Sequence, residues 1–304
     1  MLLTDPATAR PAPNPADPRT LIADTDAWFP DVDFAATAPP STPSPSASAP
    51  SGAPLNLICL PYAGGTPSIF RGWAAELGPA VHLVPVLLPG RGLRSREQPY
   101  TAMRPLAEHL AAAIAARGLA VAGGYALFGH SMGALVAYEV ACELRRLGFP
   151  EPAHLFVSGS KAPHLYADRG DHRLTDPQLR RLVRDLGGLG PDEQVGEAYL
   201  QHRLPVLRAD LSVCERYRWT PRPPLRCPAT ALCATGDPIA TAAQVEAWRE
   251  HTTGSLLRRD LPGNHFYLTG PARPLLLAEL RRELHAPVRP RTGVPADLSG
   301  RNST

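Results

Sequence analysis

The sequence lacks the features that mark membrane proteins, secreted proteins and zinc proteins. It has no run of about 18 apolar residues, so no membrane-spanning helix is expected. Asp5 and Pro6 come too early for the apolar region of a signal peptide. The five cysteines are odd in number and form no C-x-x-C pair, which argues against a disulfide framework and against a zinc site. We therefore expect a cytoplasmic protein with buried free thiols, no bound metal and no membrane partner.

The chain also lacks a strong charge of either sign. Its formal net charge is +3 over 304 residues, which is too small for a dedicated nucleic-acid-binding protein. Lys161 is the only lysine, so arginine supplies nearly all of the positive charge. The composition thus favours a globular protein that acts on a small molecule or on another protein.

The N-terminal part and the C-terminal end differ in composition from the middle of the chain. Residues 1–23 and 286–304 are expected to be disordered tails. Residues 37–54 are almost wholly Ala, Pro, Ser, Thr and Gly, which bury too little surface to offset the entropy of ordering, so a flexible linker is expected. Residues 24–36 carry aromatic side chains among aspartates. We expect them to pack on the body as an edge strand, with a short docking motif as the alternative.

From residue 55 to residue 285 the hydrophobic pattern alternates between short apolar runs and longer helical spacings. The runs that predict strands lie at residues 55–60, 81–88, 125–129, 154–160, 229–235 and 256–262. This alternation predicts an α/β fold with a mostly parallel sheet flanked by helices. Residues 165–224 interrupt it with helical patterns only. Insertions at the carboxyl ends of strands usually cover a site, so this stretch is expected to be a helical lid.

A serine stands between two glycines at Gly129-His130-Ser131-Met132-Gly133, with a predicted strand before it and a predicted helix after it. This is the context of a nucleophile elbow, in which a strained turn projects the serine oxygen. The glycines leave room for that turn, and the helix N-terminus directs its dipole and free N–H groups at the reaction centre. The pattern predicts that Ser131 is a catalytic nucleophile.

A serine hydroxyl needs a base and an acid to become a good nucleophile. In the elbow fold these residues follow the serine in chain order. His265 lies in a loop just after the last predicted strand, which suits the base. Asp237 follows the strand before it and suits the acid that holds the imidazole. Asp210 is the rival acid, but it lies within the lid pattern.

An acyl-transfer site also needs an oxyanion hole. One donor is expected to be the backbone N–H of Met132, the residue after the nucleophile. The second is expected from the glycine-rich loop Pro61–Gly65, with Ala63 preferred and Tyr62 as the alternative. These residues complete the apparatus of a serine acyl hydrolase.

Several motifs in a fixed order resemble one family over roughly residues 24–285. They are LPYAGG (60–65), LPGRG (88–92), FGHSMGALVAYEVA (128–141), VSGSKAPH (157–164), LPVLRADL (204–211), GDP (236–238) and PGNHFYL (262–268). Together they are similar to the type II thioesterases of polyketide and nonribosomal peptide synthesis. The resemblance implies an α/β-hydrolase fold and hydrolysis of acyl or aminoacyl thioesters from the phosphopantetheine arm of a carrier protein.

On this resemblance the enzyme has no cofactor of its own, because the phosphopantetheine belongs to the carrier. Tyr62 and His130 are expected to contact the substrate, and the lid arginines are expected to attract an acidic carrier protein. We expect a monomer whose partners are acyl or peptidyl carrier proteins and small acyl thioesters. The alternatives are a general serine esterase or lipase, a chain-releasing thioesterase, and an inactive hydrolase that serves as a docking module.

Overall fold

The structure is a computed structural model, and it describes residues 25–30, 53–120, 124–188 and 193–285. The expected tails (1–23 and 286–304) and nearly all of the expected linker (37–54) lie outside the described residues. In the described part, six parallel strands form one sheet in the order β2-β1-β3-β4-β5-β6. The strands are β1 (Leu55–Leu60), β2 (Val81–Pro85), β3 (Tyr125–His130), β4 (His154–Ser158), β5 (Ala229–Ala234) and β6 (Leu256–Leu261).

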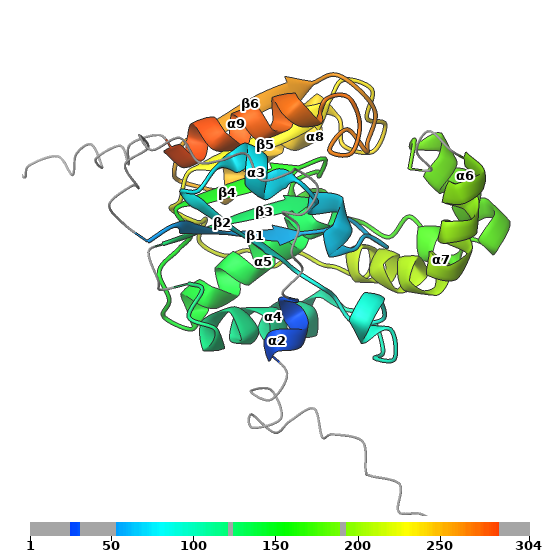
Figure 1. Ribbon diagram of the computed structural model, residues 1–304, viewed down its shortest axis with the longest axis horizontal. Coiled ribbons are helices and arrows are strands. Elements are labelled where there is room, and N and C mark those ends of the chain that lie inside the picture. The colour runs from blue at the N-terminus through cyan, green and yellow to red at the C-terminus, as the bar shows by residue number, and fades with distance from the viewer. Residues whose placement is uncertain (1–24, 31–52, 121–123, 189–192, 286–304) are drawn as a thin grey trace, which may run out of the picture.

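Helices cover both faces of this sheet (Figure 1). On one face lie α4 (Met103–Ala116) and α5 (Met132–Arg146), and on the other lie α3 (Trp73–Leu77) and α9 (Arg273–His285). The link from β5 to β6 holds α8 (Ala242–Glu246), which a 3-10 helix, η5 (Ala247–His251), continues. The other 3-10 helices are η1 (Pro67–Phe70), η2 (Gly92–Arg94), η3 (Pro163–Leu165) and η4 (Asp171–Arg173). The expected α/β fold, a mostly parallel sheet flanked by helices, is confirmed, and every described strand of the sheet is parallel.

The sequence explains why β3 is central and β2 is an edge strand. Every residue of β3 is buried, as is typical of a strand that is covered on both faces. In β2, Pro85 pairs with Cys59 of β1, and the next ladder bond runs from the N–H of Val86 to the carbonyl of Cys59 at 2.9 Å. The nitrogen of Pro85 therefore faces away from β1, where an edge strand needs no donor. The strand expected over residues 81–88 ends at Pro85.

The aromatic leader packs on the body, but not as the predicted strand. Residues 25–28 form one helical turn, α2 (Thr25–Trp28), that lies on α4. Trp28 and Phe29 are both buried, and the Arg94 guanidinium lies 4.3 Å from the centroid of the Trp28 ring. Adjacent residues of a strand point to opposite faces, whereas a helical turn lets two neighbours face the same body. Phe34 lies outside the described residues.

The stretch expected to be a lid contains α6 (Asp176–Asp185) and α7 (Glu193–Glu215), which stand beyond one end of the sheet (Figure 1). The two helices share a small apolar cluster of buried leucines: Leu179, Leu200, Leu204 and Leu207. Arg208 of α7 donates hydrogen bonds to the carbonyls of His172 and Leu174 and pairs with Asp176, which ties α7 to the start of α6. None of the helices among the described residues has the length and apolar character that a bilayer crossing requires.

Candidate active site

Ser131 occupies a strained turn between β3 and α5. Its φ is 56° and its ψ is −119°, and it is the only non-glycine residue of the described chain with a positive φ. Its N–H donates to the carbonyl of Ser158 at 2.8 Å, which fixes the turn against the end of β4. A side-chain-bearing residue in this conformation costs free energy and persists where the surrounding structure enforces it, often at functional sites.

The two glycines around Ser131 are required by close backbone packing. A Cβ atom at Gly129 would lie 2.1 Å from the carbonyl oxygen of Gly133. A Cβ atom at Gly133 would lie 2.3 Å from the carbonyl oxygen of Leu60. The first turn of α5 therefore rests directly on the ends of β3 and β1, and this contact brings the loop after β1 beside the serine.

The structure brings Ser131, His265 and Asp237 together in one hydrogen-bonded chain. His265 Nε2 lies 3.0 Å from Ser131 Oγ, and His265 Nδ1 lies 2.7 Å from Asp237 Oδ2. The other carboxylate oxygen of Asp237 accepts the N–H groups of Ile239 and Ala240. This arrangement holds the Nδ1 proton toward the acid and leaves Nε2 facing the serine hydroxyl, which suits a general base.

Sheet topology explains how residues so far apart in sequence meet. Ser131 follows β3, Asp237 follows β5 and His265 follows β6. Because these strands are parallel, their carboxyl ends lie at the same edge of the sheet, where ligand sites of open α/β sheets are found. Asp237 and His265 are both buried, whereas Ser131 is half-buried and keeps a path to a substrate.

His130 was expected to contact the substrate, and its environment contradicts that expectation. Its side chain is fully buried. His130 Nε2 donates to the carbonyl of His265 at 2.9 Å, because a carbonyl only accepts, and Nδ1 then accepts from Ser158 Oγ at 2.9 Å. Ser158 in turn bonds to the hydroxyl of Tyr267. Burial lowers the pKa of His130 well below its usual value, which agrees with this neutral form. His130 thus positions the backbone of the loop that carries His265.

The expected oxyanion donors lie on either side of Ser131. Met132 is the first residue of α5, where backbone N–H groups have no partner within the helix. Ala63 is half-buried in the loop after β1, where it packs between the core of the sheet and the apolar cluster of the lid. In the same loop the Gly65 N–H donates to the Tyr62 carbonyl at 2.8 Å. The oxyanion roles of Met132 and Ala63 stay predictions.

Asp210, the rival acid, is engaged elsewhere. It is buried on α7, where both of its carboxylate oxygens accept from the Arg91 guanidinium at 2.7 Å. One of these oxygens also accepts the N–H of Gly64 at 2.7 Å. Because the Nδ1 atom of His265 already bonds to Asp237, the geometry favours Asp237 as the acid of the site. Sequence reasoning missed the connection of Asp210 to the loop after β1.

The end of α6 lies over the loop that carries His265. A Cβ atom at Gly187 would lie 2.1 Å from Asn264 Nδ2, and one at Gly188 would lie 2.7 Å from the Phe266 ring. The Phe266 ring also meets the Tyr62 ring edge-on, with 4.9 Å between the centroids. The segment after α6 therefore contacts the loop of His265, and α7 contacts the loop after β1 through Asp210.

The five cysteines are free and offer no competing nucleophile. Four are buried and Cys214 is half-buried. Burial raises the pKa of the Cys142 thiol to about 11 and that of Cys227 to about 12, so both stay protonated near neutral pH. These thiols therefore contribute packing rather than chemistry.

One cluster of the described residues has ligand atoms close enough for a metal ion. Asp168, His172 and Glu215 place one such atom each within 4.8 Å of one another. The Glu215 carboxylate already accepts the backbone N–H groups of Asp171 and His172 as well as the His172 ring. The cluster thus secures η4 against α7, and we assign it no metal.

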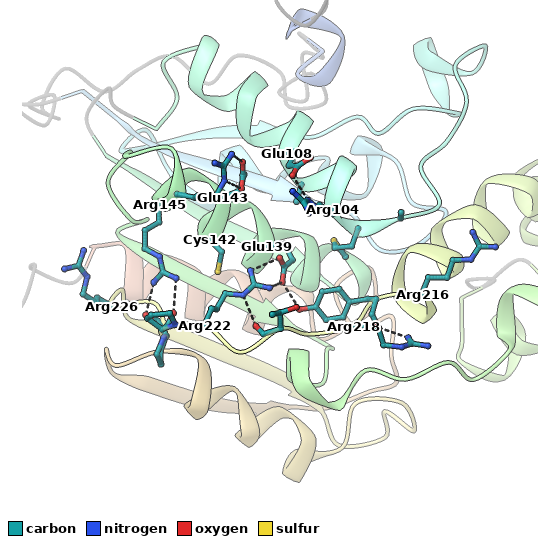
Figure 2. Close-up of a pocket in the computed structure, with 18 residues that line it drawn as sticks. Arg104, Glu108, Glu139, Cys142, Glu143, Arg145, Arg216, Arg218, Arg222 and Arg226 are labelled. Atoms are coloured by element: carbon teal, nitrogen blue, oxygen red, sulfur yellow. Dashed lines mark hydrogen bonds and ion pairs between the residues drawn. The ribbon is translucent and has the colours of Figure 1, made fainter. Parts of the chain in front are cut away.

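A cavity of about 970 Å³ lies away from the triad, between α4, α5 and the segment that follows α7 (Figure 2). Its charged lining residues are Arg104, Glu108, Glu139, Glu143, Arg145, Arg146, Arg216, Arg218, Arg222 and Arg226. Many of these charges pair with one another or with near neighbours. Arg222, for example, donates to both oxygens of Glu139 at 2.9 Å. Because neither Ser131, Asp237 nor His265 lines this cavity, we assign it no role in the chemistry at Ser131.

Comparisons with known proteins agree with the geometry. The family model of the thioesterase domain matches residues 55–284. Thioesterase PikA5 from Streptomyces venezuelae is 39% identical over 214 residues, which cover 70% of this chain and 75% of that protein. The solved structure of RedJ, a thioesterase from the prodiginine biosynthetic pathway in Streptomyces coelicolor, is 60% identical. That match covers 86% of this chain and 95% of RedJ, with a TM-score of 0.74.

A second similar solved structure is that of a type II thioesterase. The type II thioesterase BorB from the borrelidin biosynthetic cluster is 36% identical to this chain. The match covers 78% of this chain and 94% of BorB, with a TM-score of 0.71. The predicted fold and the predicted resemblance are both confirmed. This chain belongs to the thioesterase domain family, with the α/β-hydrolase fold and with type II thioesterases of biosynthetic clusters among its relatives.

Proposed function

We propose that this protein hydrolyses acyl or aminoacyl thioesters carried on the phosphopantetheine arm of carrier proteins in polyketide or nonribosomal peptide synthesis, and so clears stalled or misprimed chains. The observation that carries the proposal is the hydrogen-bonded chain from Ser131 through His265 to Asp237 at a nucleophile elbow. Relatives with matching folds, such as RedJ and BorB, are thioesterases of biosynthetic pathways, which supports the choice of thioesters over other acyl compounds.

The proposed reaction has two steps. In the first, Ser131 Oγ attacks the thioester carbonyl carbon while His265 Nε2 accepts the hydroxyl proton. The N–H groups of Met132 and Ala63 stabilise the tetrahedral oxyanion, and its collapse expels the pantetheine thiolate, which takes the proton from His265. In the second step, a water molecule attacks the acyl-serine with the same base, and the free acid leaves. This sequence uses no resident cofactor or metal.

The lid arginines contribute less to carrier recognition than the sequence suggests. Arg173 pairs with Asp168, Arg208 pairs with Asp176, and Arg222 pairs with Glu139. Arg216, by contrast, is exposed and forms no ion pair within the described residues. We expect the remaining exposed arginines to speed the encounter with an acidic carrier protein, an effect that salt screens.

The test compares one acyl group on three leaving groups. These are a carrier protein, a minimal pantetheine mimic and an oxygen ester, each measured at low and at high ionic strength. We expect the highest kcat/KM on the carrier protein, with an advantage over the mimic that shrinks as salt rises. Equal efficiency on carrier and mimic at low salt would refute carrier recognition. Equal efficiency on the oxygen ester would favour a general esterase.

The control for this experiment is Ser131→Ala. It should lower the hydrolysis rate at least about a thousandfold, as removal of a triad member does. Turnover by Ser131→Ala near that of the unmodified protein would contradict the assignment of the nucleophile, whatever the preferred leaving group.

A further inference from the structure

A buried ion pair joins the lid to the segment between β2 and η2. Arg91, which precedes η2, and Asp210, on α7, are separated by 119 residues in sequence. Their side chains are only 1% and 3% exposed, and two parallel N–H···O bonds of 2.7 Å connect them. A bidentate contact of this kind fixes orientation as well as distance.

The pair also holds the backbone of the loop after β1. Asp210 Oδ2 accepts the N–H of Gly64 at 2.7 Å, and Arg91 Nη1 donates to the carbonyl of Gly65 at 3.1 Å. Gly64 has a φ of 77°, and the side chain of Leu207 from α7 lies 3.6 Å from where its Cβ atom would be. The lid helix thus contacts the loop through both a carboxylate and an apolar side chain.

These contacts determine where the Ala63 N–H points. Each peptide group is planar, and its C=O and N–H point in opposite directions. The bond from the Gly65 N–H to the Tyr62 carbonyl orients the peptide plane before Ala63, which contains the Ala63 N–H. The bond from the Gly64 N–H to Asp210 orients the plane after Ala63. Both planes that flank the expected oxyanion donor are therefore fixed.

We propose that Asp210, held by Arg91, is a positioning residue that sets the oxyanion loop and couples it to lid helix α7. The proposal rests on the thioesterase function proposed above. A buried ion pair adds little stability compared with well-packed apolar residues, because both charges must leave water. The pair instead fixes the loop after β1, through its bonds to the Gly64 N–H and the Gly65 carbonyl. A displacement of α7 would release the Gly64 N–H and so loosen the Ala63 donor.

The test uses the double variant Arg91→Met/Asp210→Leu, which removes both charges and leaves neither one unpaired. We expect a Tm close to that of the unmodified protein and a kcat for a small acyl thioester that is about 10- to 100-fold lower. This is less than the loss of about 10²- to 10³-fold when an oxyanion donor is deleted outright. KM and the pH profile of kcat/KM should stay unchanged, because His265 and Asp237 are untouched. Affinity for a boronic acid that forms a tetrahedral adduct on Ser131 should fall in parallel with kcat.

The matched control is Glu139→Gln, which breaks the ion pair with Arg222 on the α5 side of the molecule (Figure 2). It should lower Tm and leave kcat and boronic acid affinity unchanged, as expected for a pair with a purely structural role. If the double variant does not fold, Asp210→Asn provides the same test, with the loss expected in kcat rather than in KM.

Failure of the positioning role and failure of the proposed function give different results in this experiment. A folded variant with the kcat and the boronic acid affinity of the unmodified protein would overturn the positioning role of Asp210. An unmodified protein without thioesterase activity would instead overturn the proposed function. In that case the rate at which a fluorophosphonate labels Ser131 carries the test, because this reaction also uses the oxyanion donors. Equal labelling rates in the double variant and the unmodified protein would then refute the coupling.

Discussion

Replacing Ser131 by glycine should make the protein more stable than replacing it by alanine. Both changes remove the hydroxyl and its bond to His265, so they differ only in the Cβ atom. That atom is attached to a residue whose φ is 56° and whose ψ is −119°, a conformation that side-chain-bearing residues rarely adopt. Alanine keeps the strain of the elbow, whereas glycine relieves it.

The size of the effect follows from two opposing terms. A residue held in such a conformation costs about 1–3 kcal/mol. Glycine itself destabilises the folded state by about 0.5–1 kcal/mol relative to alanine, because it loses more conformational entropy on folding. The net gain in the free energy of unfolding is therefore about 1 kcal/mol. In a folded part of this size that gain corresponds to a rise in Tm of about 3 °C for Ser131→Gly over Ser131→Ala.

The assay is thermal unfolding followed by far-UV circular dichroism on both variants under identical conditions. Ala112→Gly is the control, because this residue lies in the middle of α4, where glycine should cost about 1 kcal/mol relative to alanine. A Tm of Ser131→Gly at or below that of Ser131→Ala would mean that the elbow conformation is not strained in solution.

Two further predictions concern acid stability and the triad. Burial lowers the pKa of both His154 and His251 to about 4, so each binds a proton more readily when unfolded. Their contribution to stability, at most about 3 kcal/mol each, is then present above about pH 6.5 and lost as pH falls toward 4. Urea unfolding at about pH 7.5 and about pH 5 should show this loss, and His154→Gln, which removes one of the two groups, should reduce it. In the triad, Asp237→Asn should lower kcat about 10⁴-fold through loss of tautomer control, and a larger loss in Asp210→Asn would mean that Asp210 is the acid.

The fold and the hydrogen-bonded grouping of Ser131, His265 and Asp237 were predictable because their signals are local. Each strand is a short apolar run, and the elbow is a contiguous pattern with glycines that the backbone contacts of Gly129 and Gly133 require. Asp237 and His265 could be chosen because each directly follows a predicted strand, and parallel topology places such positions at one edge. None of these inferences needs a long-range contact to be known in advance.

The roles of Asp210 and His130 were not predictable, because they depend on contacts between distant segments. Asp210 meets an arginine 119 residues away, and His130 bonds to a carbonyl 135 residues away. Nothing local separates a buried positioning histidine from one that faces the substrate. The leader was predicted as a strand from its aromatic content, whereas the burial of adjacent Trp28 and Phe29 requires a helical turn.

The position of β6 at the edge of the sheet links chemistry to the order in which the chain is made. His265 follows β6, the last of the described strands, and β6 pairs only with β5 in the described sheet. A growing chain that has already formed the elbow still has no base beside Ser131. It acquires one only when β6 docks and the loop after it is fastened by His130. Ser131 therefore gains its hydrogen-bonded imidazole only when β6 is paired with β5, which ties completion of the site to the last strand of the described sheet.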